Sequence, residues 1–120
     1  MHVRRYDLVN VSGETHRFLG DERSLECLSH VRLRHPTREP HVYTWRTPLP
    51  TFVAAGAVVH ADDEHATLQT WHKFVNAEVF VMGKSSLSFT AALLSTGQIY
   101  YPFNPNMTVL KVVPEHWQPC

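Results

Sequence analysis

The residues best suited to chemistry stand in a short polar stretch made of Gly83, Lys84, Ser85 and Ser86. An apolar, strand-like run over residues 78–82 precedes the stretch, and an apolar, helix-like segment follows it. A serine hydroxyl accepts a hydrogen bond from a first-turn amide, so one of the two serines is expected to cap the helix. The free amides and partial positive charge of a helix N-terminus attract anions, and the lysine adds a full charge. The stretch therefore predicts a phosphate-binding loop.

A second group of charged residues, Arg4, Arg5 and Asp7, stands at the end of the first predicted strand, residues 2–6, and in the loop after it. In the common doubly wound order the first strand lies beside the fourth, here residues 78–82. The carboxyl ends of these two strands flank the switch point where such sheets bind ligands. A guanidinium group binds phosphate through two parallel hydrogen bonds. We therefore expect at least one of the two arginines to contact an anion in the same crevice as the polar stretch.

The elements that carry the two loops alternate between strands and helices. We expect strands at 2–6, 41–45, 57–60, 78–82 and 98–101, and helices at 22–33, 51–55, 64–76 and 87–94. Asp21 is the expected N-cap of the first helix, and Asp62 or Asp63 that of the third. Such alternation implies right-handed crossovers and a parallel sheet. We therefore expect an α/β protein, a single Rossmann-like three-layer domain over residues 1–120 with a mostly parallel sheet.

The composition is that of one globular domain. The chain has 120 residues, of which 43% are hydrophobic and 18% charged, and equal numbers of basic and acidic residues give a formal net charge of +0. This balance offers no basic surface for nucleic acid, and no apolar run is long enough to span a membrane, so neither is expected as a partner. Cys27 and Cys120 fit no metal or redox spacing and leave a disulfide open.

The polar stretch has two other interpretations besides a phosphate loop. Gly83, Lys84 and Ser85 match the end of a P-loop, but that motif needs another glycine five residues before Gly83, where Glu78 stands. The loop is also too short to wrap a triphosphate, so a P-loop NTPase is disfavoured. A capped helix without a ligand stays open, because serine caps are common.

Potential metal ligands gather in the middle of the chain. Only His65 and His72 share a helix face there, and Asp62 and Asp63 are better explained as helix caps. With nine histidines in the chain, such clustering arises easily by chance, and no recognised ligand spacing is present. We therefore predict no metal site. The residues concerned are His60, Asp62, Asp63, Glu64, His65 and His72.

The two charged loops carry motifs that resemble those of a known family. The run HVRRYD, from His2 to Asp7, resembles the HxRRxD signature of the fucosyltransferase-like superfamily, which includes α1,2-, α1,6- and protein O-fucosyltransferases. The run KSSLSF, from Lys84 to Phe89, resembles the later SSFS-type element, and residues 76–82 resemble the strand that precedes it. Residues 18–21 and the following helix also stand where such proteins place an equivalent segment, so the resemblance covers nearly the whole chain.

The resemblance implies a fold and a ligand. These enzymes have the GT-B fold, two Rossmann-like domains with a cleft between them, and the C-terminal domain binds a nucleotide sugar, usually GDP-fucose, without a metal. This chain would be that donor-binding half, its first strand truncated and its N-terminal half missing. It would transfer fucose or another sugar to a glycan or protein acceptor. The compartment stays open: a Golgi or ER lumen for a eukaryotic chain, the cytoplasm for a bacterial one.

The resemblance also assigns residue roles. Arg4 would contact the diphosphate and stabilise the leaving group, with support from Arg5. Ser85 and Ser86 would bind phosphate through their hydroxyls and amides. Thr70 stands about where α1,6-type relatives carry an acidic residue. The implied donor-binding set is His2, Arg4, Asp7, Lys84, Ser85, Ser86 and Ser88.

An alternative from another functional class is a non-catalytic or decayed phosphate- or nucleotide-binding module without turnover. Tyr6 stands where Gly or Thr is usual in the family motif, and its bulk crowds the loop. The acceptor site and any general base would lie largely on the missing half. Whether this chain alone is an enzyme is therefore left open by the sequence.

Overall fold

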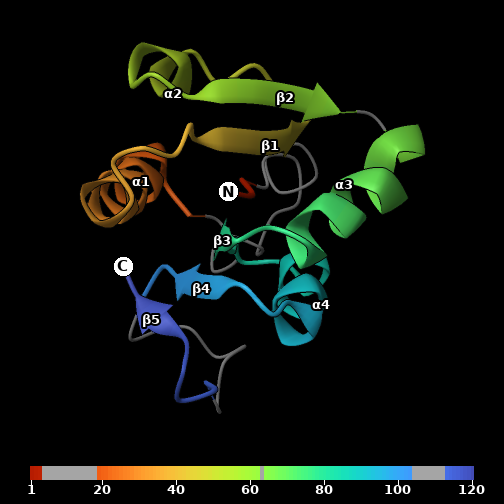
Figure 1. Ribbon diagram of the computed structural model, residues 1–120. Coiled ribbons are helices and arrows are strands. Elements are labelled where there is room, and N and C mark those ends of the chain that lie inside the picture. The colour runs from red at the N-terminus through yellow and green to blue at the C-terminus, as the bar shows by residue number, and fades with distance from the viewer. Residues whose placement is uncertain (4–18, 63, 104–112) are drawn as a thin grey trace.

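The computed structural model describes residues 1–3, 19–62, 64–103 and 113–120 (Figure 1). Helices and strands alternate along the described chain, which confirms the predicted α/β class. In chain order the elements are α1 (Asp21–Arg34), β1 (His41–Trp45), α2 (Pro50–Ala54), β2 (Val58–Asp62), the 3₁₀ helix η2 (Glu64–Ala66), α3 (Thr67–Val75), β3 (Val79–Val81), α4 (Ser86–Leu94), β4 (Gln98–Tyr101) and β5 (Gln118–Pro119).

The strands form two short parallel sheets, one of β1 and β2 and one in the order β3-β4-β5. Residues 1–3 run between them. The amide of Val3 donates to the carbonyl of Tyr43 at 2.9 Å, and the amide of His2 donates to the carbonyl of Val81 at 3.1 Å. The first predicted strand therefore lies beside the fourth predicted strand, β3, as expected. The order of the strands across the molecule is β2, β1, residues 1–3, β3, β4, β5.

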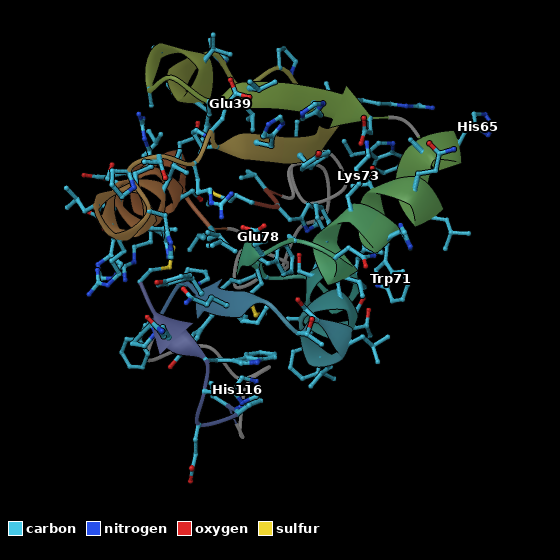
Figure 2. The ribbon with its side chains drawn as sticks, in the orientation of Figure 1. Glu39, His65, Trp71, Lys73, Glu78 and His116 are labelled. Carbon is cyan, nitrogen blue, oxygen red and sulfur yellow. A yellow bond between two sulfur atoms is a disulfide. The ribbon has the colours of Figure 1, made fainter. Side chains whose placement is uncertain are left out.

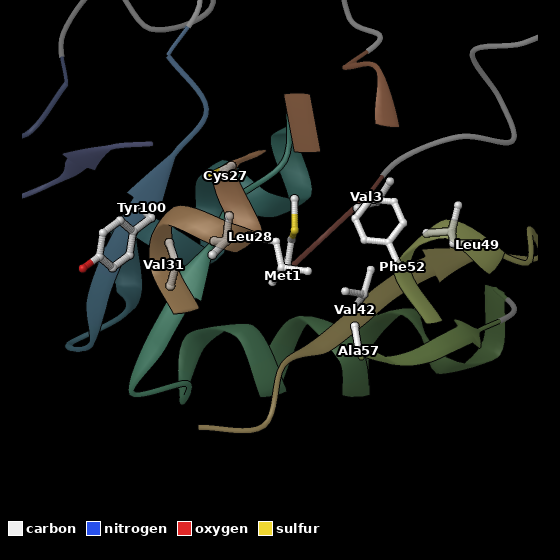
Figure 3. Close-up of a cluster of buried hydrophobic side chains, with 11 residues drawn as sticks. Met1, Val3, Cys27, Leu28, Val31, Val42, Leu49, Phe52, Ala57 and Tyr100 are labelled. Atoms are coloured by element: carbon white, nitrogen blue, oxygen red, sulfur yellow. The ribbon is translucent and has the colours of Figure 1, made fainter. Parts of the chain in front are cut away.

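Two hydrophobic cores lie on opposite sides of these strands, because side chains alternate along a strand. In Figure 1, α1 lies on one side of the strands and α3 on the other. The first core gathers Met1, Val3 and Val42 with residues of α1 and α2 (Figure 3). The second core lies against α3 and α4 and contains Phe74 and Phe80. This alternation turns the side chain of His2 toward Phe74, with the two rings 5.3 Å apart.

Several predicted boundaries shift by a residue or more. The N-cap of α1 is Gly20, with no side-chain cap, and the predicted cap Asp21 lies inside the first turn, where a carboxylate suits the helix dipole. Asp62 is not a cap either, because it ends β2 opposite Trp45 and its carboxylate accepts a hydrogen bond from the Thr70 hydroxyl. The other proposed cap, Asp63, lies outside the described residues.

The C-terminal residues are tied to α1. A disulfide joins Cys27 and Cys120 with their Cα atoms 4.8 Å apart, and Arg23 donates to the carbonyl of Cys120 at 2.6 Å. The sequence left this disulfide open. The bond holds β5, which was not predicted, alongside β4. None of the helices in the described part of the chain has the length and apolarity needed to cross a lipid bilayer.

Candidate functional site

The loop between β3 and α4 lies directly against the first residues of the chain. A Cβ atom on Gly83 would come within 2.5 Å of the carbonyl oxygen of His2, a distance that no side chain tolerates. Glycine is therefore the residue that lets the two backbones approach each other this closely. The approach brings the ring of His2 to the start of α4.

The start of α4 is fixed by a network of two serines. Ser85 is the N-cap, and its hydroxyl accepts a hydrogen bond from the amide of Ser88 at 3.1 Å. The prediction that Ser85 or Ser86 caps this helix is thus confirmed, with Ser85 as the cap. The hydroxyl of Ser88 accepts from the amide of Gly83 at 3.2 Å. The loop is consequently closed on itself by two hydroxyl groups.

His2 completes this network from the neighbouring strand. Its Nδ1 atom is in hydrogen-bond contact with the hydroxyl of Ser88 and lies 3.3 Å from the hydroxyl of Ser85. Both hydroxyls already accept from backbone amides, so each still has its own proton to donate. An unprotonated Nδ1 of His2 is the acceptor within reach of both. The imidazole therefore fastens the first strand to the N-terminus of α4.

The candidate residues differ in how far they reach the surface. Ser88 is 0% exposed and Ser85 is buried, so both support the loop from inside. Ser86 is exposed, and Lys84 and His2 are half-buried. Burial lowers the pKa of the Lys84 ammonium group. The surface of this loop is consequently formed by Lys84 and Ser86.

The first turn of α4 adds backbone donors at the same place. Within the part of the chain described, the amides of Ser86 and Leu87 form no hydrogen bond. Amides at this position point out of the helix end, where the helix dipole is positive. Together with the side chains of Lys84 and Ser86, they make a surface suited to an anion such as phosphate.

Three predicted site residues, Arg4, Arg5 and Asp7, lie outside the described residues. Their expected contribution to the anion site stays a prediction. The described backbone nevertheless fixes where their segment starts, because Val3 is hydrogen-bonded to β1 and His2 contacts the serines of α4.

A small cavity of about 50 Å³ lies beside His2 at the carboxyl ends of the strands. It is lined by Thr44, among others, and the hydroxyl of this buried threonine has no hydrogen-bond partner in the described structure. The neighbouring Asp62 and Thr70 are bonded to each other. The sequence did not single out Thr44, since threonine is an ordinary strand residue. The cavity suits a water molecule or one ligand hydroxyl.

Two of the potential metal ligands around β2 and α3, His60 and Asp62, have other partners. The ring of His60 stacks on that of Tyr43 at 4.4 Å, and its Nε2 atom lies 2.9 Å from Nδ1 of His41. Asp62 accepts from Thr70. Among the described residues no group of three or more His, Cys, Asp or Glu side chains is placed to hold a metal ion.

Comparisons of the chain with protein-family models, with curated proteins and with solved structures found no match. A function for the chain is therefore inferred from its own residues.

Proposed function

We propose that this chain is the donor-binding domain of a fucosyltransferase-like glycosyltransferase, which binds the diphosphate of a GDP-sugar. One observation carries the proposal: His2, which opens the HVRRYD run, contacts Ser85 and Ser88 of the KSSLSF run. His2 and Ser88, which belong to the two runs that resemble the family's signatures, are 86 positions apart in the chain. A shared ligand site is a direct reason for two such motifs to meet.

The strand order supports a Rossmann-like fold for this domain. Counting residues 1–3 as the first strand, the described order across the molecule is 3-2-1-4-5-6 in chain sequence, the order of doubly wound nucleotide-binding domains. Such domains bind ligands where the order reverses, between the first and fourth strands. His2 and Gly83 lie at that point. In this proposal the chain is a three-layer domain that corresponds to the C-terminal half of a GT-B enzyme.

The proposed chemistry is sugar transfer without a metal. The bond between the anomeric carbon and the diphosphate oxygen breaks, an acceptor oxygen bonds to that carbon, and the acceptor's proton passes to a base on the N-terminal half. Negative charge grows on the departing diphosphate. Lys84, the first-turn amides of α4 and Arg4 stabilise it, and each well-aimed donor in such a site contributes roughly 3–4 kcal/mol.

Titration calorimetry with GDP tests this proposal. We expect Arg4→Ala and Lys84→Gln to weaken GDP binding at least about tenfold, because each removes a charge-assisted hydrogen bond. Arg34→Ala is the matched control, since Arg34 is exposed at the far end of α1 and should leave binding unchanged. Folded protein that does not bind GDP, or equal binding by Arg4→Ala and the unmodified chain, would reject the proposal.

A second candidate is a non-catalytic or decayed phosphate- or nucleotide-binding module. The observation that favours it is that the hydroxyls of Ser85 and Ser88 are already engaged within the protein, so the serine run also serves simply to cap a helix. Assays for GDP-sugar hydrolysis and sugar transfer distinguish the two. Turnover by this chain, or by this chain combined with a GT-B N-terminal half, excludes the non-catalytic module.

A further inference from the structure

Arg46, the residue that follows β1, has a backbone conformation that residues other than glycine rarely adopt. Its φ is 52°, in the left-handed region, where a Cβ atom crowds the following carbonyl oxygen. Two hydrogen bonds hold this turn. The amide of Arg46 donates to the carbonyl of Asp62 at 3.1 Å, and the Thr47 hydroxyl donates to the carbonyl of Trp45 at 3.1 Å. Strained residues that the surrounding structure fixes in this way cluster at ligand-binding sites.

The side chain of Arg46 is held in place as well as its backbone. Its Cζ atom lies over the ring of Trp45, 5.6 Å from the ring centroid, which is a cation–π contact. Because the planar guanidinium group is already ordered, less side-chain freedom is lost when its N–H groups bind a ligand. A guanidinium group has five N–H donors, so it keeps contacts within the protein and still offers two to a ligand. The exposed Arg46 is thus a preorganised donor of two parallel hydrogen bonds.

The strand order sets the position of Arg46 relative to the proposed anion site. β1 lies next to residues 1–3, which lie next to β3, so the ends of β1 and β3 are about 10 Å apart at the usual strand spacing. In doubly wound domains the diphosphate binds beside the first strand, and a residue further along the chain contacts the nucleoside. β1 is the second strand here. The nucleoside of a ligand whose diphosphate lies beside Lys84 therefore extends toward Arg46.

The small cavity between these two places offers a partner to the ribose. It is lined by both His2 and Trp45. Thr44, which also lines it, is 4% exposed, and its hydroxyl forms no hydrogen bond within the part of the chain that is described. A buried hydroxyl in this state calls for a partner, and one ribose hydroxyl supplies it. With the ribose there, the base lies over the end of β1, next to Trp45 and Arg46.

Two parallel N–H donors match one purine better than the other. The O6 and N7 atoms of guanine are adjacent acceptors, and arginine binds both of them at once in protein–DNA complexes. Adenine presents an amino donor beside N7, so it faces one of the two N–H groups with another donor. We propose that Arg46 recognises the base of the bound nucleotide and selects guanine over adenine through O6 and N7. The inference rests on the proposed function and adds the residue that determines which nucleotide binds.

Titration calorimetry with GDP, IDP and ADP tests the role of Arg46. IDP keeps O6 and N7 but lacks the 2-amino group, so it should bind like GDP, whereas ADP should bind about tenfold more weakly. The preference for GDP over ADP should disappear in Arg46→Lys, which keeps the charge but lacks the planar fork. It should also disappear in Arg46→Gly. This variant is expected to fold, because glycine adopts a positive φ without strain.

Lys73→Gln is the matched control. Lys73 lies on α3 (Figure 2), and its Nζ atom is 5.4 Å from the ring centroid of Tyr43, in the middle of β1. The variant therefore loses a comparable contact between a cation and a ring and should keep the preference for GDP over ADP. Equal affinity of the unmodified chain for GDP and ADP, a preference that survives in Arg46→Gly, or IDP binding as weak as that of ADP would overturn the role of Arg46, while GDP binding itself would stand. A folded chain that binds none of the three nucleotides would reject the proposed function together with it.

Discussion

The imidazole of His2 is in hydrogen-bond contact with the hydroxyl of Ser88, 86 residues further along the chain. The same hydroxyl accepts from the amide of Gly83, so one fully buried oxygen joins the first strand to the loop that follows β3. Any change that displaces this oxygen moves both halves of the proposed anion site at once. The structural and ligand-binding effects of substitutions here should therefore be separable only by matched controls.

Gly83→Ala should disturb both stability and GDP binding. Its Cβ would lie 2.5 Å from the carbonyl oxygen of His2, and backbone atoms cannot yield as a flexible side chain can. Overpacking of this kind costs about 1–3 kcal/mol, measured as the free energy of unfolding in urea. Gly20→Ala is the control, because its Cβ would meet no atom within 4 Å. Equal unfolding free energies for the two variants would contradict the close approach.

Ser88→Ala and Ser86→Ala should differ in their effect on stability. Loss of the buried Ser88 hydroxyl leaves the amide of Gly83 without its acceptor, which costs about 1–3 kcal/mol of stability. Ser86 is exposed, so Ser86→Ala should change the unfolding free energy little while weakening GDP binding. Urea unfolding and calorimetry on the same two proteins provide both measurements. A stable Ser88→Ala protein would show that the network does not hold the loop.

The elements that the sequence predicts best are those with strong local signals. The bounds of β1 and β4 are as predicted, because their β-branched and aromatic residues are flanked by prolines and glycine. The serine cap of α4 was also predictable, since it depends on a hydroxyl three residues from its amide partner. These features are decided by neighbours in the chain.

The features that the sequence could not predict depend on distant residues. β2 extends to Asp62 because it pairs along the whole of β1, and that pairing takes Asp62 away from the helix that it was expected to cap. β5 contains a proline and has no apolar run, and it forms through its pairing with β4. The unpartnered hydroxyl of Thr44 and the small cavity that it lines exist only once the strands are assembled. No local pattern identifies them.

The stability of the protein should fall on mild acidification because of His60. Burial lowers the pKa of His60, and the nearby His41 lowers it further, whereas Asp62 raises it. Lys73 and the α-amino group of Met1 also lower it. The net depression means that the folded protein binds this proton less tightly than the unfolded chain does.

The sign of the pH effect follows from this depression. The unfolded histidine has a pKa of about 6.5. The stability contributed by neutral His60 is therefore fully present above that pH and is lost as the pH falls from there through the lower, folded pKa. Urea unfolding at pH 7.5 and at pH 5.5 should show a smaller loss for His60→Gln than for the unmodified chain. His72→Gln, at an exposed position on α3, should retain the full loss. An identical loss of unfolding free energy between the two pH values in all three proteins would contradict the role given to His60.

Removal of the disulfide should cost more stability than any single substitution above. Cys27 and Cys120 are 93 residues apart, and closing a loop of this length stabilises a protein by about 4–5 kcal/mol in the chain-entropy account. Urea unfolding with and without dithiothreitol should show that difference for the unmodified chain and none for Cys120→Ser. Cys27→Ser and the double variant should match Cys120→Ser to within about 1 kcal/mol, since all three remove the same bond. If dithiothreitol lowers the unfolding free energy of Cys120→Ser, or leaves that of the unmodified chain unchanged, the disulfide does not tie the C-terminus to α1.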